Sequence, residues 1–171
     1  MIRSCVFRGA FNDLLKNLAQ DQNFLRITKK PDTAYKDGTM EELVLRFFAY
    51  YYDRASFTHD VTNFLNAYMG KNENKNLLEM ERLFRSVCTK LARLPYGIVK
   101  SPKRNFTSTV MWEAVTVGFA DALATGKTDI RLDDFYEWVN DEEFVKSVTG
   151  ATNSANMLSK RLKYAKDKFM R

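Results

Sequence analysis

The chain has 171 residues, of which 45% are hydrophobic and 28% charged, and its formal net charge is +6. This balance is typical of one folded domain and excludes an intrinsically disordered chain. The 7 Gly and 3 Pro are too few for a β-sandwich or barrel, whose strands need frequent turns. No apolar run reaches the roughly 18 residues of a membrane span, and the N-terminus lacks the apolar stretch of a secretory signal. The two cysteines, Cys5 and Cys88, are interpreted as free thiols rather than a disulfide, as in a reducing compartment. Together with the missing span and signal, they predict a cytoplasmic protein.

Helical periodicity begins near the start of the chain. Apolar side chains recur every three or four residues over 3–18, as a helix buried on one face requires. A second helix is predicted over 39–54, where Thr39 and Glu42 have the spacing of a capping box. The aromatic run 47–52 lies on this helix and is interpreted as core, because its rings point all around the axis rather than along one surface.

The rest of the chain continues the helical pattern. Asp60 is the expected N-cap of a third helix, and Gly70 is its expected left-handed stop. Further helices are predicted over 77–94, 107–126, 133–150 and 154–171. The helix predicted over 133–150 is expected to break near Asn140. The sequence therefore predicts an all-α fold, a single domain of about seven helices spanning 1–171.

The positive charge is concentrated in the last predicted helix. Residues 154–171 contain six basic side chains and one acidic one, so the rest of the chain is close to neutral. Such a helix could follow a nucleic-acid backbone, because phosphate binding requires little beyond clustered cations. The alternative is that its lysines only solvate a terminal helix. With a Pro-containing loop that is also basic, the candidate contacts are Lys100, Lys103, Arg104, Lys160, Arg161, Lys163, Lys166 and Lys168.

No catalytic motif is recognisable in the sequence. His59 is the single histidine, which excludes a Cys2His2 zinc site, and neither a nucleophile elbow nor a phosphate-binding glycine loop is present. Paired carboxylates at 41–42, 133–134 and 141–143 each fall at a predicted helix start, where acids complement the helix dipole. We therefore expect no catalytic residue, metal or cofactor. A metal-dependent nuclease that the fold assembles from Asp133 and Glu142 stays open as an alternative.

Several segments resemble GmrSD-type proteins, a bacterial family with a ParB/sulfiredoxin-like N-terminal domain. The matching strings are FRGAFNDLL at 7–15, EELVLRFFA at 41–49, FLNAYM at 64–69, and GATNS followed by KRL within 150–162. The spacing from ELVLRF to FLN is the most distinctive feature. The resemblance covers most of the chain.

The resemblance implies a helical module that lacks the catalytic half of the family. There, the catalytic or nucleotide-handling residues, including an Asp-Gly-Gln-Gln-Arg motif, belong to the N-terminal domain, and some relatives add a C-terminal HNH nuclease. The expected function is to support or regulate a ParB-like catalytic domain or subunit in restriction or phage defence, or to help bind DNA. The alternative is a stand-alone DNA-binding protein that uses the basic last helix. Arg46, four residues after Glu42, is expected either to pair with it and tie helices together or to contact the missing domain or DNA.

Overall fold

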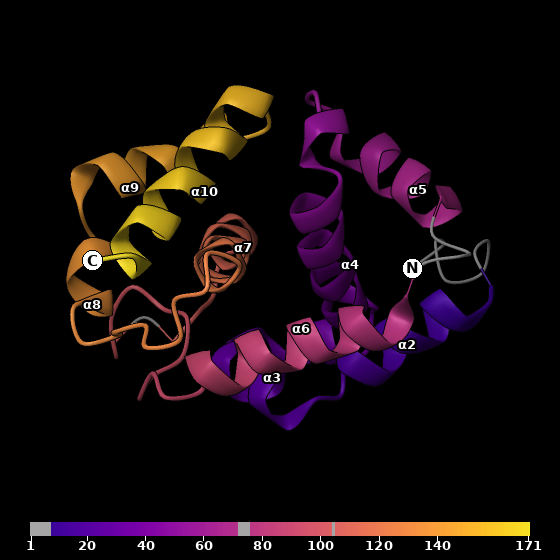
Figure 1. Ribbon diagram of the computed structural model, residues 1–171, viewed down its shortest axis with the longest axis horizontal. Coiled ribbons are helices and arrows are strands. Elements are labelled where there is room, and N and C mark those ends of the chain that lie inside the picture. Colours follow the sequence, from indigo (N-terminus) through magenta and orange to yellow (C-terminus); the bar gives the residue numbers. More distant parts are fainter. Residues whose placement is uncertain (1–7, 72–75, 104) are drawn as a thin grey trace.

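The computed structural model describes residues 8–71, 76–103 and 105–171, and in these ranges its regular elements are helices without a β-strand (Figure 1). The predicted all-α fold is confirmed. Within the described ranges, no helix combines the length and apolar character needed to cross a lipid bilayer. The elements are α2 (Ala10–Leu18), α3 (Gln22–Ile27), η1 (Asp32–Tyr35), α4 (Thr39–Tyr52), η2 (Arg54–Ser56), α5 (Val61–Lys71), α6 (Leu77–Leu91), α7 (Thr109–Leu123), α8 (Phe135–Trp138), α9 (Glu142–Val148) and α10 (Ala155–Phe169).

Helix α7 lies at the centre of the fold. Its sequence is apolar on nearly every side, and residues 111–120 are all buried. A helix of this kind must be enclosed by other elements, and α7 packs against α4, α6, α9 and α10. Ser108 caps its first turn by accepting a hydrogen bond from the backbone N–H of Met111 at 3.2 Å. Figure 1 shows α7 nearly end-on with the other helices arranged around it.

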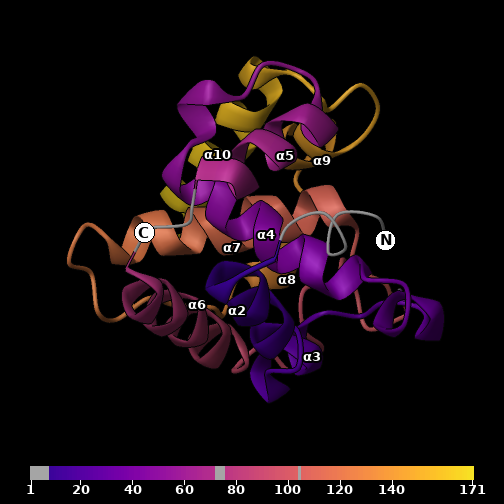
Figure 2. The same cartoon turned by 90° about the vertical axis from the view of Figure 1, so that its right-hand side faces the viewer.

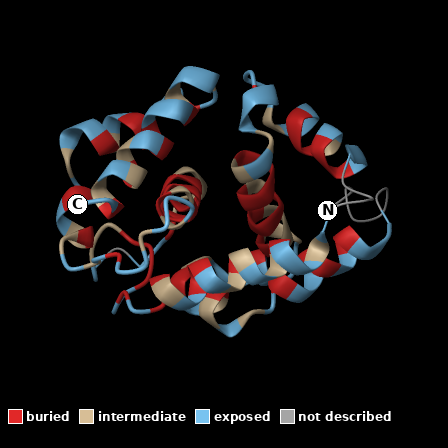
Figure 3. Cartoon of the chain, viewed as in Figure 1, coloured by how far each residue is buried: buried red, intermediate tan, exposed pale blue. Residues whose placement is uncertain are grey.

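The remaining helices cover three sides of α7. In Figure 1, α8–α10 lie on one side, α4 and α5 on the opposite side, and α2, α3 and α6 below. Figure 2 shows α6 beside α2 and α3, against which it packs. Buried residues line the inward faces of the helices and exposed residues the outward faces (Figure 3). In this core Phe47 meets Phe84 and Trp112 edge to face, with ring centroids 5.3 and 6.4 Å apart.

Helices α7 and α10 approach each other closely at Gly118. A methyl group at this position would lie 2.7 Å from Cβ of Ala165 and 2.9 Å from the backbone nitrogen of Lys166. Both distances are shorter than atoms in a packed interior tolerate, so this crossing requires glycine. Gly118 therefore sets the separation between the central helix and the basic last helix.

The capping box predicted from Thr39 and Glu42 is wrong. The carboxylate of Asp37 accepts hydrogen bonds from the backbone N–H and the hydroxyl of Thr39, at 2.9 and 2.6 Å. Glu42 instead accepts from the guanidinium of Arg46 one turn later. The acceptor for the backbone N–H of Thr39 is thus Asp37, two residues upstream, and not Glu42 as the capping box required.

The other predicted helix ends are confirmed in part. Asp60 is a true cap, since its Oδ1 accepts from the N–H three residues later at 3.0 Å. Gly70 is not a stop, because α5 continues through it to Lys71. The break near Asn140 is confirmed between α8 and α9. The described ranges contain nine α-helices, of which all but the short α3 and α8 are long, so the prediction of about seven helices is confirmed. Residues 3–7 of the first predicted helix lie outside those ranges.

Candidate nucleic-acid interface

Arg161 does not belong to the outer face of α10, and that prediction is wrong. Its side chain is 1% exposed. Because a helix turns about 100° per residue, Arg161 shares a face with Leu158 and Ala165, which are buried. Its Nη2 donates to Oε2 of Glu113 at 2.8 Å, and its Nη1 donates to the backbone oxygen of Thr152 at 2.9 Å. Arg161 therefore connects α10 to α7 and is closed to a ligand.

The four lysines of α10 differ in exposure and in their partners. Lys160 and Lys163 are exposed, and Lys166 is partly exposed. Lys168, also predicted on the outer face, has a side chain only 12% exposed, and its Nζ donates to Oδ2 of Asp141 at 2.6 Å. The outward cationic surface of α10 is therefore narrower than the sequence suggests.

Glu113 is the centre of a charge cluster that joins three helices. Its side chain is 1% exposed, and its Oε1 accepts from Nη1 of Arg46 at 2.7 Å while Oε2 accepts from Arg161. Arg46 also donates from Nε and Nη2 to Oε1 of Glu42, at 3.1 and 2.9 Å, so the predicted Arg46–Glu42 pair is confirmed. Helices α4, α7 and α10 are thus linked by Glu42, Arg46, Glu113 and Arg161. This geometry is that of an anchor, and a contact from Arg46 to DNA or another domain stays a prediction.

Lys30 and Tyr50 lie within electrostatic range of this cluster. Burial lowers the pKa of Lys30, and the charge of Arg46 lowers it further. Its Nζ donates to Oγ1 of Thr109 at 3.1 Å. Burial raises the pKa of the Tyr50 hydroxyl, and the charge of Glu113 adds to the increase. Tyr50 is buried in the core, whereas Lys30 and Thr109 are partly exposed.

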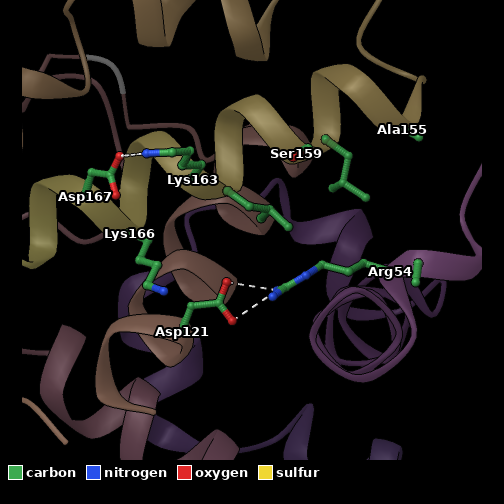
Figure 4. Close-up of a pocket in the computed structure, with 10 residues that line it drawn as sticks. Arg54, Asp121, Ala155, Ser159, Lys163, Lys166 and Asp167 are labelled. Atoms are coloured by element: carbon green, nitrogen blue, oxygen red, sulfur yellow. Dashed lines mark hydrogen bonds and ion pairs between the residues drawn. The ribbon is translucent and has the colours of Figure 1, made fainter. Parts of the chain in front are cut away.

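An open groove of about 680 Å³ lies between α10 and the segment that follows α4. Figure 4 shows Lys163 and Lys166 on the α10 wall, Arg54 on the opposite wall and Asp121 of α7 at the base. Nη1 of Arg54 donates to both carboxylate oxygens of Asp121, at 3.0 and 2.9 Å. Lys163 pairs with Asp167 on the next turn. Lys166 has no ion-pair partner among the described residues, so it is the groove cation most available to an anion.

The other predicted basic residues lie elsewhere. Lys160 lines a smaller hollow of about 330 Å³ on the α9 side of α10. Lys100 is partly buried and Lys103 is exposed, both in the loop before α7 and outside the lining of either hollow. Arg104 lies outside the described residues. The structure therefore groups Lys163 and Lys166 with Arg54, which was not predicted, and leaves Lys160 and the loop residues apart.

The carboxylates considered for a nuclease lie in separate surface ion pairs. Asp133 accepts from Nε of Arg131 at 3.2 Å, and Glu142 pairs with Lys146, all four side chains being well exposed. Within the ranges that the structure describes, no three His, Cys, Asp or Glu side chains are close enough to hold a metal ion. The positions of Asp133 and Glu142 therefore do not support metal-dependent cleavage.

No catalytic role was expected of the single histidine or of the two cysteines, of which Cys5 lies outside the described residues. His59 is exposed in the loop before α5, whereas Cys88 is fully buried on α6. Burial raises the pKa of the Cys88 thiol well above its ordinary value. A buried neutral thiol is a poor nucleophile, so we interpret Cys88 as a packing residue.

Comparison of the chain with protein-family models, with curated proteins and with solved structures finds no match in any of the three. The similarity of its sequence strings to GmrSD-type proteins therefore stays a prediction.

Three residues of the interface and its support escaped the sequence analysis. Glu113 carried a usable signal, since it is the only charged residue between 109 and 120 in an otherwise apolar helix. Such an isolated acid in a core helix requires a buried cation. Arg54 and Asp121 carried no comparable signal, because they are 67 residues apart and each stands in an ordinary polar context.

Proposed function

We propose that this chain is a non-catalytic helical module that binds the backbone of double-stranded DNA through the outer ridge of α10 and the adjoining groove. The observation that carries this proposal is the row formed by Lys160, Lys163 and Lys166, which follow one another at three-residue steps. Residues three apart are neighbours on a helix surface, so these ammonium groups curve around the outer side of α10, with Lys163 and Lys166 on the groove and Lys160 toward α9. Arg54 faces the same groove from its other wall.

The length of this row suits a phosphate backbone. Each three-residue step rises by about 4.5 Å, so the row spans about 9 Å along α10. B-DNA carries one phosphate per roughly 3.4 Å along each strand, so the row faces two or three phosphates. Contacts to phosphates fix position and carry no base sequence, and we therefore expect little sequence preference.

The contacts beneath α10 support this role by holding the helix in place. Arg161 binds Glu113, and Gly118 lets α10 lie directly against α7. Lysines on a fixed helix lose less conformational freedom on binding than lysines on a mobile segment. The interior charge cluster is therefore proposed to act as a scaffold for the ridge.

The similarity to GmrSD-type proteins suggests a context for this binding. We propose that the module supports or regulates a ParB-like catalytic domain by holding the DNA near it, since a second linked contact raises the effective concentration of a domain on its target. A stand-alone DNA-binding protein would use the same interface. A reading frame for a ParB-like domain fused or adjacent to this one favours the first, and its absence favours the second.

The proposal is tested by fluorescence anisotropy with a labelled duplex of about 20 base pairs. Neutralising three phosphates predicts a slope of about −2.7 for log K against log salt, which is a loss of roughly 40-fold between 50 and 200 mM. A variant with Lys160→Ala, Lys163→Ala and Lys166→Ala should lose most of this slope and at least roughly tenfold in affinity at 50 mM.

The matched control removes the same charge from elements that do not line the groove. Lys16→Ala, Lys36→Ala and Lys90→Ala change α2, the end of η1 and α6, and should leave most of the affinity in place. The proposal fails if the wild-type protein does not bind DNA at 50 mM salt. It also fails if both triple variants weaken binding equally.

A further inference from the structure

Two of the three groove cations are already bound to acids of the same groove. Arg54 donates to both oxygens of Asp121, and Lys163 pairs with Asp167 (Figure 4). The Arg54 side chain is 42% exposed, whereas that of Asp121 is 14% exposed. The guanidinium is thus open to the solvent side of the groove, and the carboxylate lies beneath it.

We propose that Asp121 and Asp167 are internal competitors of the DNA phosphates and set the affinity and salt dependence of the groove. This inference rests on the proposed binding of DNA through the same surface. A phosphate that enters the groove is attracted by Arg54, Lys163 and Lys166 but repelled by the two carboxylates. The acids therefore weaken binding and keep the contact reversible.

The charges of the groove make this competition substantial. Arg54, Lys163 and Lys166 against Asp121 and Asp167 leave a net charge of +1 on the groove lining, and neutralising both acids would raise it to +3. All five side chains line one hollow, so their charges act on a bound anion within about one Debye length, roughly 10 Å at 0.1 M salt. At such distances screening does not remove the repulsion.

The test is a gain of affinity, which simple damage to the fold cannot produce. Asp121→Asn with Asp167→Asn keeps the shape of both side chains and removes their charge. The double variant is expected to bind the duplex about tenfold more tightly at 50 mM salt and to show a steeper salt slope. A control with Asp13→Asn and Asp32→Asn makes the same change in net charge on α2 and η1 and is expected to gain less than about twofold.

The outcomes separate this inference from the proposed function. If the groove double variant binds no more tightly than the control while the lysine triple variant still loses affinity, the inference is overturned and DNA binding by α10 stands. If the lysine triple variant keeps wild-type affinity, DNA uses another surface and both proposals fall. Asp167→Asn alone, on an exposed side chain, provides the same readout if thermal melting shows that Asp121→Asn disturbs the fold.

Discussion

Neutralising Glu113 is expected to lower the free energy of unfolding by about 3–5 kcal/mol, because it leaves a buried charge without its counterion. In the wild type, Glu113 accepts from Arg46 at 2.7 Å and from Arg161 at 2.8 Å. Arg46 keeps Glu42 as a partner after the change to glutamine. Arg161 keeps only a backbone oxygen, and its side chain is 1% exposed, so the loss falls mainly on this residue.

A double-mutant cycle separates the buried charge from the general effect of substitution. Arg161→Met alone should cost about 2 kcal/mol, since Glu113 retains Arg46 as its partner. The combination of Glu113→Gln and Arg161→Met removes both charges and fills the space with an apolar chain of similar length. It should cost less than Glu113→Gln alone, giving a coupling energy of at least about 2 kcal/mol.

The assay is urea unfolding at pH 7, followed by the fluorescence of Trp112 and Trp138 and by circular dichroism. The midpoint should shift while the slope against urea stays constant. Glu137→Gln on the exposed face of α8 is the matched control and should change stability by less than about 0.5 kcal/mol. A cost below about 1 kcal/mol for Glu113→Gln, or a double variant equal to the sum of the single ones, would refute the reasoning.

Three further predictions concern packing and polar contacts. Gly118→Ala should lower the free energy of unfolding by about 1–3 kcal/mol, because the added Cβ meets α10. Gly70→Ala should raise it by up to about 1 kcal/mol, because a Cβ there has nothing within 4 Å and alanine favours the helix. Thermal melts in which Gly118→Ala is the more stable variant would contradict this. Asp141→Asn should cost about 0.5–1 kcal/mol at pH 7. Hydrogen bonds from Lys168 and a tyrosine of α10 lower the pKa of Asp141 below 3.8, so the cost should disappear as the pH falls through that lowered pKa, and a cost that persists at about pH 2 in pH-dependent melts counts against the pair. Tyr50→Phe removes a buried hydroxyl that has no hydrogen-bond partner in the described residues. In urea unfolding it should leave the free energy of unfolding unchanged or raise it by up to about 1 kcal/mol. A clear loss of stability would show that the hydroxyl makes a hydrogen bond.

The helices could be predicted from the sequence because one-sided burial leaves a local pattern. The periodic apolar residues of 154–171 gave α10 within a few residues, and the polar stretch at Asn140 marked the break between α8 and α9. Helix starts were less certain, because an acceptor can come from a neighbouring residue. At Thr39 the acceptor is Asp37 rather than the residue three positions later.

The candidate interface could be predicted only in part, because a basic residue can lie on either the exposed or the buried face of its helix. Arg161 has the spacing of the buried face of α10, yet its charge suggested the surface. Its counterion Glu113 lies 48 residues earlier, and such a partner cannot be paired from periodicity. The Arg54–Asp121 pair could not be predicted for the same reason, because the two residues are 67 positions apart. The sequence therefore predicted the exposed lysines of α10 but not the groove beside them.

The central proposal, that DNA contacts the outer ridge of α10 and its groove, is tested most directly by NMR. Isotope-labelled protein is titrated with a duplex of about 20 base pairs at 50 mM salt, where phosphate contacts are strong. We predict that backbone amide shifts concentrate around Lys160, Lys163, Lys166 and Arg54 and shrink as salt is added. An unchanged spectrum, or shifts confined to α2, α3 and α6, would contradict it.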